Sequence, residues 1–269
     1  MIRRTLNKSQ RMNQPKIVIF DLEIIPDLKQ ALKVWPRLGS WPGKTLRASV
    51  TTICSIGYKV IGDQSATVLN AWDYPNWKKD INDDSELCRQ FYDIIKDADA
   101  VVTHNGIRFD WKYYQTRILK HGLGPLPKIP NLDTKKIASS ELFLFDNKLD
   151  TLSDFFLEDK KLDHEGWDLW VAVCEDDPKA KAKMSKYCKQ DVELTHRNFT
   201  KLKPFFKNIP NYNLFTSVSI ARVCANCGST RLKSNGWRYT KTRAYQRLQC
   251  IDCKSWTQLD TKQGSPRSV

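Results

Sequence analysis

Acidic side chains stand in three short motifs of this sequence, and the first motif joins two carboxylates. Asp21 and Glu23 lie at the end of an apolar run at residues 16–22. Residues two apart on a β-strand point to the same face, so these carboxylates should lie side by side. They repel each other, and keeping both ionised normally requires a bound cation or a basic neighbour. The alternative is a pair of solvated acids at an exposed strand end.

The second and third motifs place further acids at a junction between a strand and a helix and on a late helix. Residues 103–110, THNGIRFD, read as a strand that turns through a glycine into a helix beginning at Asp110. Asp110 could equally serve only as the cap of that helix. Tyr187 and Asp191 are one helical turn apart and share a face, which also suits a packed tyrosine beside a solvated acid. Glu193 lies off that face, and we leave it out of the site.

In this order the motifs resemble those of the DEDDy subgroup of DnaQ-like exonucleases, which have a ribonuclease-H-like fold. The proofreading domains of family B DNA polymerases are of this kind. The resemblance rests on D-x-E, H-N-G-x-x-F-D and Y-x-x-x-D and spans about residues 15–207. It implies a metal-dependent 3′-to-5′ exonuclease, a hydrolase that cleaves phosphodiester bonds. Two departures are Ile24-Ile25-Pro26, where the family often has a small polar residue after the glutamate, and a Trp- and Lys-rich stretch at residues 34–47.

The resemblance also implies a role for each site residue. Two Mg²⁺ or Mn²⁺ ions about 4 Å apart can activate a water and stabilise the leaving oxygen, and carboxylates are the ligands that these hard ions prefer. Asp21 would bridge the ions, and Asp110 would hold one of them. Glu23 and Asp191 would complete the other, with Tyr187 orienting the attacking water. The implied contacts to the terminal nucleotide are Leu22, Asn105 and Phe109.

The remaining pattern predicts an α/β fold with a mixed sheet flanked by helices. A first strand at residues 16–22 precedes a hairpin at 52–60 and 66–72, and another strand follows at 100–103. The predicted helices lie at residues 85–97, 110–120, 133–142, 151–157 and 178–203. We divide the chain into a flexible basic tail, the exonuclease domain, a linker, a zinc ribbon and a second tail, at residues 1–15, 16–207, 208–219, 220–260 and 261–269.

Four of the eight cysteines form two close pairs near the end of the sequence. Cys224 with Cys227 and Cys250 with Cys253 have the spacing of a tetrahedral structural Zn²⁺ site. Between the pairs, alternating strands surround Asn235-Gly236, a hairpin turn signature. The arrangement resembles the zinc ribbons of insertion-element transposases, with disulfides as the alternative. Its basic strands carry Trp237, Tyr239 and Trp256, which suits nucleic acid, while a protein partner is the alternative.

Composition agrees with a polyanionic partner. The sequence has 44 Lys and Arg against 30 Asp and Glu, a formal net charge of +14. It has no long apolar run, so we expect a cytoplasmic location and no membrane partner. We expect nucleic acid as the substrate, and we favour DNA with single-stranded 3′ ends over RNA. An RNA-processing exoribonuclease, a transposase-like protein and a non-catalytic nucleic-acid-binding protein are the alternatives.

Overall fold

A computed structural model describes residues 14–26, 51–162, 167–215, 223–241 and 243–263. The chain divides into two compact units, one at Ile17–Thr200 and one that includes Lys201–Val269. The predicted tail at residues 1–15 lies almost wholly outside the described residues, and the stretch at residues 34–47 lies wholly outside them. Within the described residues, no helix is long and apolar enough to cross a bilayer.

The larger unit is built on a mixed sheet, as the sequence predicts, and this sheet has five strands. The strand order is β3-β2-β1-β4-β5. β1 pairs antiparallel with β2 and parallel with β4, β2 pairs antiparallel with β3, and β4 pairs parallel with β5. The bounds are β1 Ile17–Pro26, β2 Thr51–Val60, β3 Thr67–Asn70, β4 Ala100–Thr103 and β5 Asn131–Asp133. The short strand β5 was not predicted, because its three residues join directly to the helix that follows.

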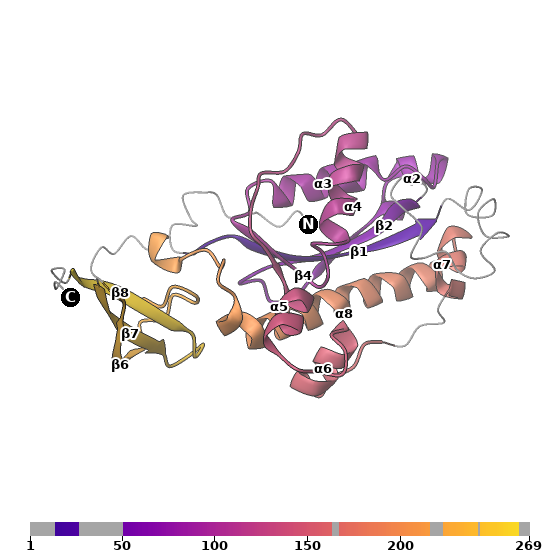
Figure 1. The fold of residues 1–269 in the computed structure, drawn as a ribbon. Coiled ribbons are helices and arrows are strands. Elements are labelled where there is room, and N and C mark those ends of the chain that lie inside the picture. The colour runs from indigo at the N-terminus through magenta and orange to yellow at the C-terminus, as the bar shows by residue number, and fades with distance from the viewer. Residues whose placement is uncertain (1–13, 27–50, 163–166, 216–222, 242, 264–269) are drawn as a thin grey trace. The chain divides into compact units, whose positions relative to one another are not determined.

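Helices cover both faces of this sheet (Figure 1). α3 and α4 lie over one face, and the long helix α8 runs across the other. The bounds are α2 Pro75–Lys79, α3 Ser85–Ile95, α4 Asp110–Lys120, α5 Thr134–Glu141, α6 Leu149–Leu157, α7 Trp167–Cys174 and α8 Pro178–Leu202. The sequence patterns predict five of these helices. α2 was missed because it has only five residues, and α7 because its sequence is apolar almost throughout and shows no helical periodicity.

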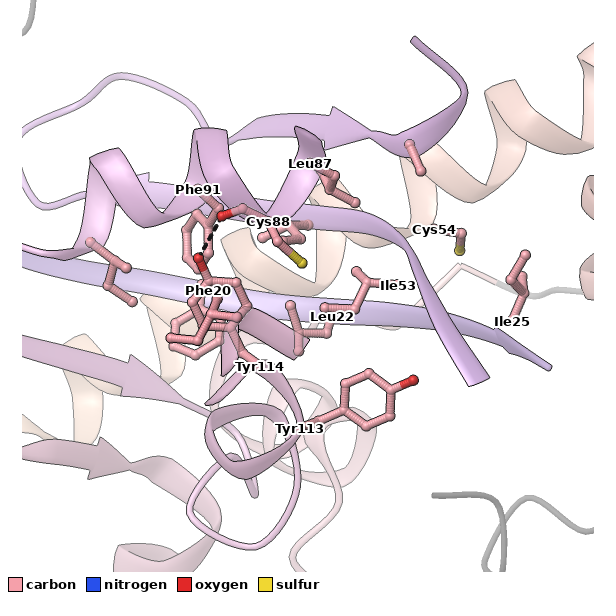
Figure 2. Close-up of a cluster of buried hydrophobic side chains, with 14 of the residues drawn as sticks. Phe20, Leu22, Ile25, Ile53, Cys54, Leu87, Cys88, Phe91, Tyr113 and Tyr114 are labelled. Atoms are coloured by element: carbon pink, nitrogen blue, oxygen red, sulfur yellow. Dashed lines mark hydrogen bonds between the residues drawn. The ribbon is translucent and has the colours of Figure 1, made fainter. Parts of the chain in front are cut away.

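β1 presents apolar side chains to one face of the sheet and acids to the other. Phe20 is fully buried and packs against Phe91 of α3, with ring centroids 5.3 Å apart. Figure 2 shows Phe20 and Leu22 within the buried cluster that α3 and α4 cover. Burying one such side chain stabilises the fold by about 1.5–3 kcal/mol. Asp21 alternates with these residues and therefore points toward the α8 face.

A buried ion pair ties α4 to α3 and to β2. Arg117 and Asp84 are 2% and 0% exposed, and Arg117 Nη2 lies 2.6 Å from Asp84 Oδ1. Arg117 Nη1 also donates to the carbonyl of Thr51 at 3.1 Å. Burial would raise the pKa of Asp84, but hydrogen bonds from His121 and Arg117 hold it below its usual value. This anchor fixes the end of α4 that lies opposite Asp110.

The smaller unit contains a three-stranded antiparallel sheet in the order β6-β7-β8. The strands are β6 Leu232–Tyr239, β7 Arg243–Cys250 and β8 Trp256–Gln263. The predicted hairpin turn at Asn235-Gly236 is wrong, because both residues lie inside β6, where the register with β7 shifts between Ser234 and Trp237. Gly236 has φ 73°, which suits a bulge as well as a turn.

A segment after α8 packs on this sheet unit. Tyr212 begins the 3₁₀ turn Tyr212–Leu214, is 6% exposed, and donates its backbone N–H to the carbonyl of Ala225 at 2.9 Å. The predicted linker at residues 208–219 is described only as far as residue 215. Its first half is therefore packed structure in the same unit as the cysteine pairs.

Candidate active site

The first pair of acids lies on β1 where the strand runs beside β2. Asp21 pairs with Gly57 and Glu23 with Ser55, and the register shifts immediately after Glu23. Glu23 is 7% exposed. One carboxylate oxygen of each acid and the Cys188 sulfur on α8 lie within 4.8 Å of one another. The strand thus carries both acids to the point where α8 crosses the sheet.

A glycine lets α8 come this close. A Cβ atom on Gly57 would lie 2.8 Å from Val192 Cγ2 and 2.9 Å from the Cys188 carbonyl oxygen, both on α8. Contacts this short do not occur, so any side chain at Gly57 would push α8 away. Since Gly57 is the register partner of Asp21, this close approach brings α8 over the acid pair. Sequence reasoning missed Gly57, because its role depends on a contact between distant segments.

Asp110 reaches the same place from the turn that joins β4 to α4. Asn105 has φ 71°, and its backbone N–H donates to Asp133 Oδ1 at 2.9 Å. Asp133 Oδ2 accepts from the backbone N–H of Ile107 at 3.1 Å, which holds the turn. Asp110 is 3% exposed, and its carboxylate accepts hydrogen bonds from its own backbone N–H and from that of Leu22 on β1. Asp110 is therefore attached to the strand that carries the first pair.

Tyr187 and Asp191 come from one face of α8, and a lysine joins them. Asp191 is 4% exposed and Tyr187 is 8% exposed. Lys161 Nζ lies 2.5 Å from Asp191 Oδ2 and 4.8 Å from the centroid of the Tyr187 ring. Burial opposes the charge of Lys161, but Asp191 and Tyr187 raise its pKa above the usual value. Sequence reasoning missed Lys161, which follows α6 in a segment without periodic pattern.

Three of the four acids have carboxyl groups whose pKa is raised, so they hold their protons to a higher pH than usual. Burial raises the pKa of Asp21 well above its usual value, and Asp110, Asp191 and Glu23 raise it further. Burial and then Asp191 raise the pKa of Glu23 to about 8. Burial raises the pKa of Asp110 to about 7. Lys161 lowers the pKa of Asp21 and Glu23, but it brings one positive charge to four carboxylates. A cluster of buried oxygen donors with excess negative charge fits hard divalent cations.

This electrostatic balance predicts how stability changes with pH when divalent ions are absent. In the unfolded chain the carboxyls lose their protons near pH ~4, whereas Glu23 and Asp110 in the fold hold theirs to about 8 and 7. Between these values the folded chain binds more protons, so its stability falls as pH rises. We expect the midpoint temperature of thermal unfolding to be lower at pH 8 than at pH 5. Each unit of difference between the folded and unfolded pKa of a carboxyl corresponds to about 1.4 kcal/mol in the free energy of unfolding.

Mn²⁺ should reverse this trend, because it binds the deprotonated carboxylates. Scanning fluorimetry in a chelated and an Mn²⁺-containing buffer measures both effects, and the ion should raise the midpoint more at pH 8 than at pH 5. The double variant Glu23→Gln, Asp110→Asn is the control and should show a flatter profile in the chelated buffer. Midpoints that do not change with pH in the wild type would rule out the raised pKa values.

The three residues implied as substrate contacts are placed differently. Leu22 is 5% exposed and lies in the buried cluster, on the face of β1 opposite Asp21 and Glu23. Phe109 packs against Tyr113 of α4, with ring centroids 5.6 Å apart, and is only partly buried. Asn105 lines a pocket of about 570 Å³. The structure brings Asn105 to an open surface, but it does not bring the Leu22 side chain to the acids.

The pocket beside Asn105 is lined mainly by polar and basic side chains. Its walls come from the turn before α4, from α5 and from the segment before α6. The lining includes four cations and two acids, namely Arg108, Lys135, Lys136, Lys148, Asp133 and Asp146. The connection between α5 and α6 also carries Phe143 and Phe145, which are 105% and 100% exposed. Cations beside exposed aromatic rings suit a flexible single strand, which offers both phosphates and unstacked bases.

In the smaller unit, the two cysteine pairs come together. The four sulfurs lie within 4.8 Å of one another. The distance from Cys224 Sγ to Cys253 Sγ is 3.6 Å, and that from Cys227 Sγ to Cys250 Sγ is 3.7 Å. Four thiolates on a tetrahedral Zn²⁺ at ~2.3 Å would stand about 3.8 Å apart, so the donor set fits zinc. The cluster is compatible with the zinc ribbon that the spacing predicts.

The surroundings of the cysteine cluster act unequally on its thiols, because burial raises the pKa of Cys224 and of Cys227 whereas the pKa of Cys253 is lowered. Burial raises the pKa of Cys253, but hydrogen bonds from Ser255 lower it to about 7. Lys203 lies close enough for all four cysteines to influence its charge, and its Nζ stands 5.0 Å from the centroid of the Tyr212 ring. Burial holds the pKa of Lys203 below its usual value, although the cysteines act in the opposite direction. An ammonium here would offset the excess negative charge of four thiolates on one Zn²⁺.

Comparison with known proteins identifies the larger unit. The family model of the RNase_H superfamily matches residues 45–202. The chain belongs to this superfamily. No curated protein matches the sequence. The structure is similar to that of the family B DNA polymerase from the hyperthermophilic archaeon Pyrobaculum calidifontis, with a TM-score of 0.53 and 16% identity over 85% of this chain and 31% of that chain.

Membership in the RNase_H superfamily supports a nuclease function, and the structural similarity shows the fold alone. The chain spans about a third of the length of the polymerase chain that it matches. Asp21 and Glu23 stand before the first residue of the family match, whereas Asp110, Tyr187 and Asp191 lie within it. The acid pair of β1 therefore enters the site on structural grounds, through its contact with α8.

Proposed function

We propose that this chain is a metal-dependent 3′-to-5′ exonuclease that removes nucleotides from single-stranded 3′ ends. The observation that carries the proposal is the convergence of four acids from β1, α4 and α8 beside Tyr187. Asp110, Asp191 and Glu23 are near enough to raise the pKa of Asp21. Such a cluster suits two Mg²⁺ or Mn²⁺ ions, which when bound would activate water and stabilise the leaving oxygen.

In this proposal, the position of each acid determines which metal ion it would bind. Asp21 lies among the other three and would contact both ions. Glu23, on which Asp191 acts more strongly than the other charged groups, would hold together with Asp191 the ion on the side of Tyr187. Asp110 is fixed to β1 by the Leu22 N–H and would hold the other ion. Lys161 forms an ion pair with Asp191, and this ion pair would have to weaken for Asp191 to bind a metal cation.

Tyr187 would position the attacking water through its hydroxyl. Burial, followed by the charge of Asp191, raises the pKa of Tyr187 to about 12. The phenol therefore keeps its proton at neutral pH and can donate a hydrogen bond, but it is a poor base. Its role is orientation, and the proton of the water passes to solvent or to a carboxylate of the cluster.

The pocket beside Asn105 is where we place the strand that leads to the cut. Its lysines and Arg108 would contact phosphates, and the exposed Phe143 and Phe145 would stack on bases. We favour DNA, following the resemblance to proofreading domains, and keep an exoribonuclease as the alternative. The ribbon unit is proposed to bind one structural Zn²⁺ through its four cysteines.

Oligonucleotides labelled at the 5′ end test the proposed polarity and mechanism together. With Mg²⁺ or Mn²⁺, wild-type protein should give a ladder that shortens one nucleotide at a time from the 3′ end. Tyr187→Phe should slow each step by about 10–100-fold, the range expected for loss of one orienting contact, while leaving strand affinity unchanged.

Matched DNA and RNA strands in the same assay decide which sugar is preferred. A strand blocked by a 3′-phosphate should resist shortening, which controls for attack at the 3′ end. Internal nicks or strand transfer in place of the ladder would contradict the exonuclease proposal and favour a transposase-like reaction.

A further inference from the structure

The small sheet of the second unit has two faces with different chemistry. Strand pairing sets Arg238 opposite Tyr245, Arg247 opposite Gln258, and Gln249 opposite Trp256. Directly paired residues share a face, and residues two apart along β7 share it too. Among the residues whose side chains the structure describes, this places on one surface, which we call the Arg-Trp face, Lys233, Arg238, Tyr245, Arg247, Gln249, Trp256 and Gln258. The register also sets Asp260 opposite Tyr245.

The other face carries the residues that hold the unit together. Leu248 and Cys250 of β7 are 5% and 0% exposed, and they alternate with Arg247 and Gln249. The same alternation puts Trp237 and Tyr239 of β6 on this second face, because Trp237 pairs with Gln246. The sequence grouped Trp237, Tyr239 and Trp256 together, but the register separates Trp256 from the other two.

The centre of the Arg-Trp face is open and preorganised. Arg238, Arg247, Trp256 and Gln258 line a pocket of about 510 Å³. The Arg247 guanidinium lies 5.7 Å from the centroid of the Trp256 ring, and Trp256 is 53% exposed. The absence of a side chain at Gly236 leaves space beside Arg247, since a Cβ there would lie 3.4 Å from Arg247 Nη2. The bulge of β6 thus leaves the guanidinium uncovered.

From these contacts we infer that the Arg-Trp face is a second binding site, separate from the acid cluster, for single-stranded nucleic acid. A base stacks on the exposed indole of Trp256, and the guanidinium groups of Arg238 and Arg247 contact the phosphates on either side. Gln258 offers an amide to a base edge. Charge favours this occupant over a protein, because residues 220–269 carry ten Lys and Arg but two Asp. One of those acids, Asp252, is already paired with Arg231.

Single strands suit this face better than duplex. Stacking on an isolated indole needs an unpaired base, and stacking tolerates any base because every base has a π-face. The three exposed cations on the face, Lys233, Arg238 and Arg247, are spaced along two neighbouring strands and can follow a backbone. The site goes beyond the proposed cleavage reaction, because it would hold strand whether or not the acid cluster cuts it.

Binding of a fluorescent single-stranded oligothymidylate to full-length, zinc-loaded protein tests the inference. All proteins carry Asp21→Asn so that the strand persists. Trp256→Ala should weaken binding about tenfold, as expected for loss of one stacked base. Tyr239→Ala is the matched control, since Tyr239 is an exposed aromatic residue on the opposite face at 75% exposure, and it should change affinity less than twofold. Zinc content must equal that of the parent in each variant.

The salt dependence of binding gives a readout that a folding defect would not imitate. Arg247→Gln should reduce the slope of log affinity against log salt by about 0.7, the value for one phosphate contact on a single strand. Equal weakening by Trp256→Ala and Tyr239→Ala, or an unchanged slope in Arg247→Gln, would overturn the inference. Cleavage of short strands by protein with Asp21 intact is measured separately, so the two proposals can fail independently.

Discussion

Replacing Asp21 with asparagine should reduce cleavage of a single-stranded 3′ end by about a thousandfold or more. Asp21 is the acid that all three others influence, and we expect it to contact both metal ions. Charge stabilisation by bound cations is worth several kcal/mol in the transition state, and each ~1.4 kcal/mol is a factor of ten in rate. Single-turnover cleavage at saturating Mn²⁺ measures the effect on the chemical step.

Glu193→Gln is the matched control for Asp21→Asn. Glu193 lies two residues after Asp191 on α8, but its carboxylate contacts Lys59 Nζ at 2.8 Å, away from the cluster. Its replacement should leave the cleavage rate within a few-fold of wild type, although the fold loses an ion pair that is partly exposed. If Asp21→Asn and Glu193→Gln slowed cleavage equally, the assignment of Asp21 to the reaction would be wrong.

Loss of zinc should unfold the smaller unit while the larger unit stays folded. The four sulfurs of the cysteine cluster are within 4.8 Å of one another, and a sheet of three short strands buries too little apolar area to fold alone. Structural zinc supplies about 10–16 kcal/mol of folding free energy in small domains. The free energy lost with the zinc is therefore larger than any other stabilising contribution in this unit. Cys227→Ser should lower zinc content from about one per chain to near zero.

Elemental analysis and amide NMR spectra of the full chain check this prediction. Cys174→Ser is the control, because Cys174 belongs to α7 and stands outside the cysteine cluster. It should retain zinc and the dispersed resonances of β6, β7 and β8. Cys227→Ser should lose those resonances and keep those of the larger unit. Wild-type protein that contains no zinc, yet shows a folded ribbon, would disprove the zinc site.

Local periodicity was enough to predict the parts of the site that share one element. Asp21 and Glu23 fall on one face because a strand repeats every two residues, and Tyr187 and Asp191 because a helix turns in about four. The same alternation explains why Leu22, between the two acids, points into the core. A substrate role for its side chain conflicts with that geometry, and only its backbone N–H reaches the site.

Contacts between distant segments were beyond the sequence pattern. Gly57 matters because Val192 and Cys188 of α8 pass over it. The residues around Gly57 in the sequence do not predict that a helix crosses the strand at this point. Lys161, which contacts Asp191, lies outside any helix or strand. The Asn235-Gly236 pair shows a third limit, since a positive φ at Gly236 serves a bulge as readily as a turn. Only pairing with β7 decides between them.

The central claim is that the four acids hold a pair of divalent ions, and counting the ions tests it most directly. Calorimetric titration of zinc-loaded protein with Mn²⁺, at a pH above the pKa of about 8 of Glu23, avoids competition from protons. We predict that the wild type binds two Mn²⁺ per chain and that Asp21→Asn loses binding at both sites. Wild-type protein that binds no Mn²⁺ in this titration, or an unchanged count in Asp21→Asn, would contradict the account.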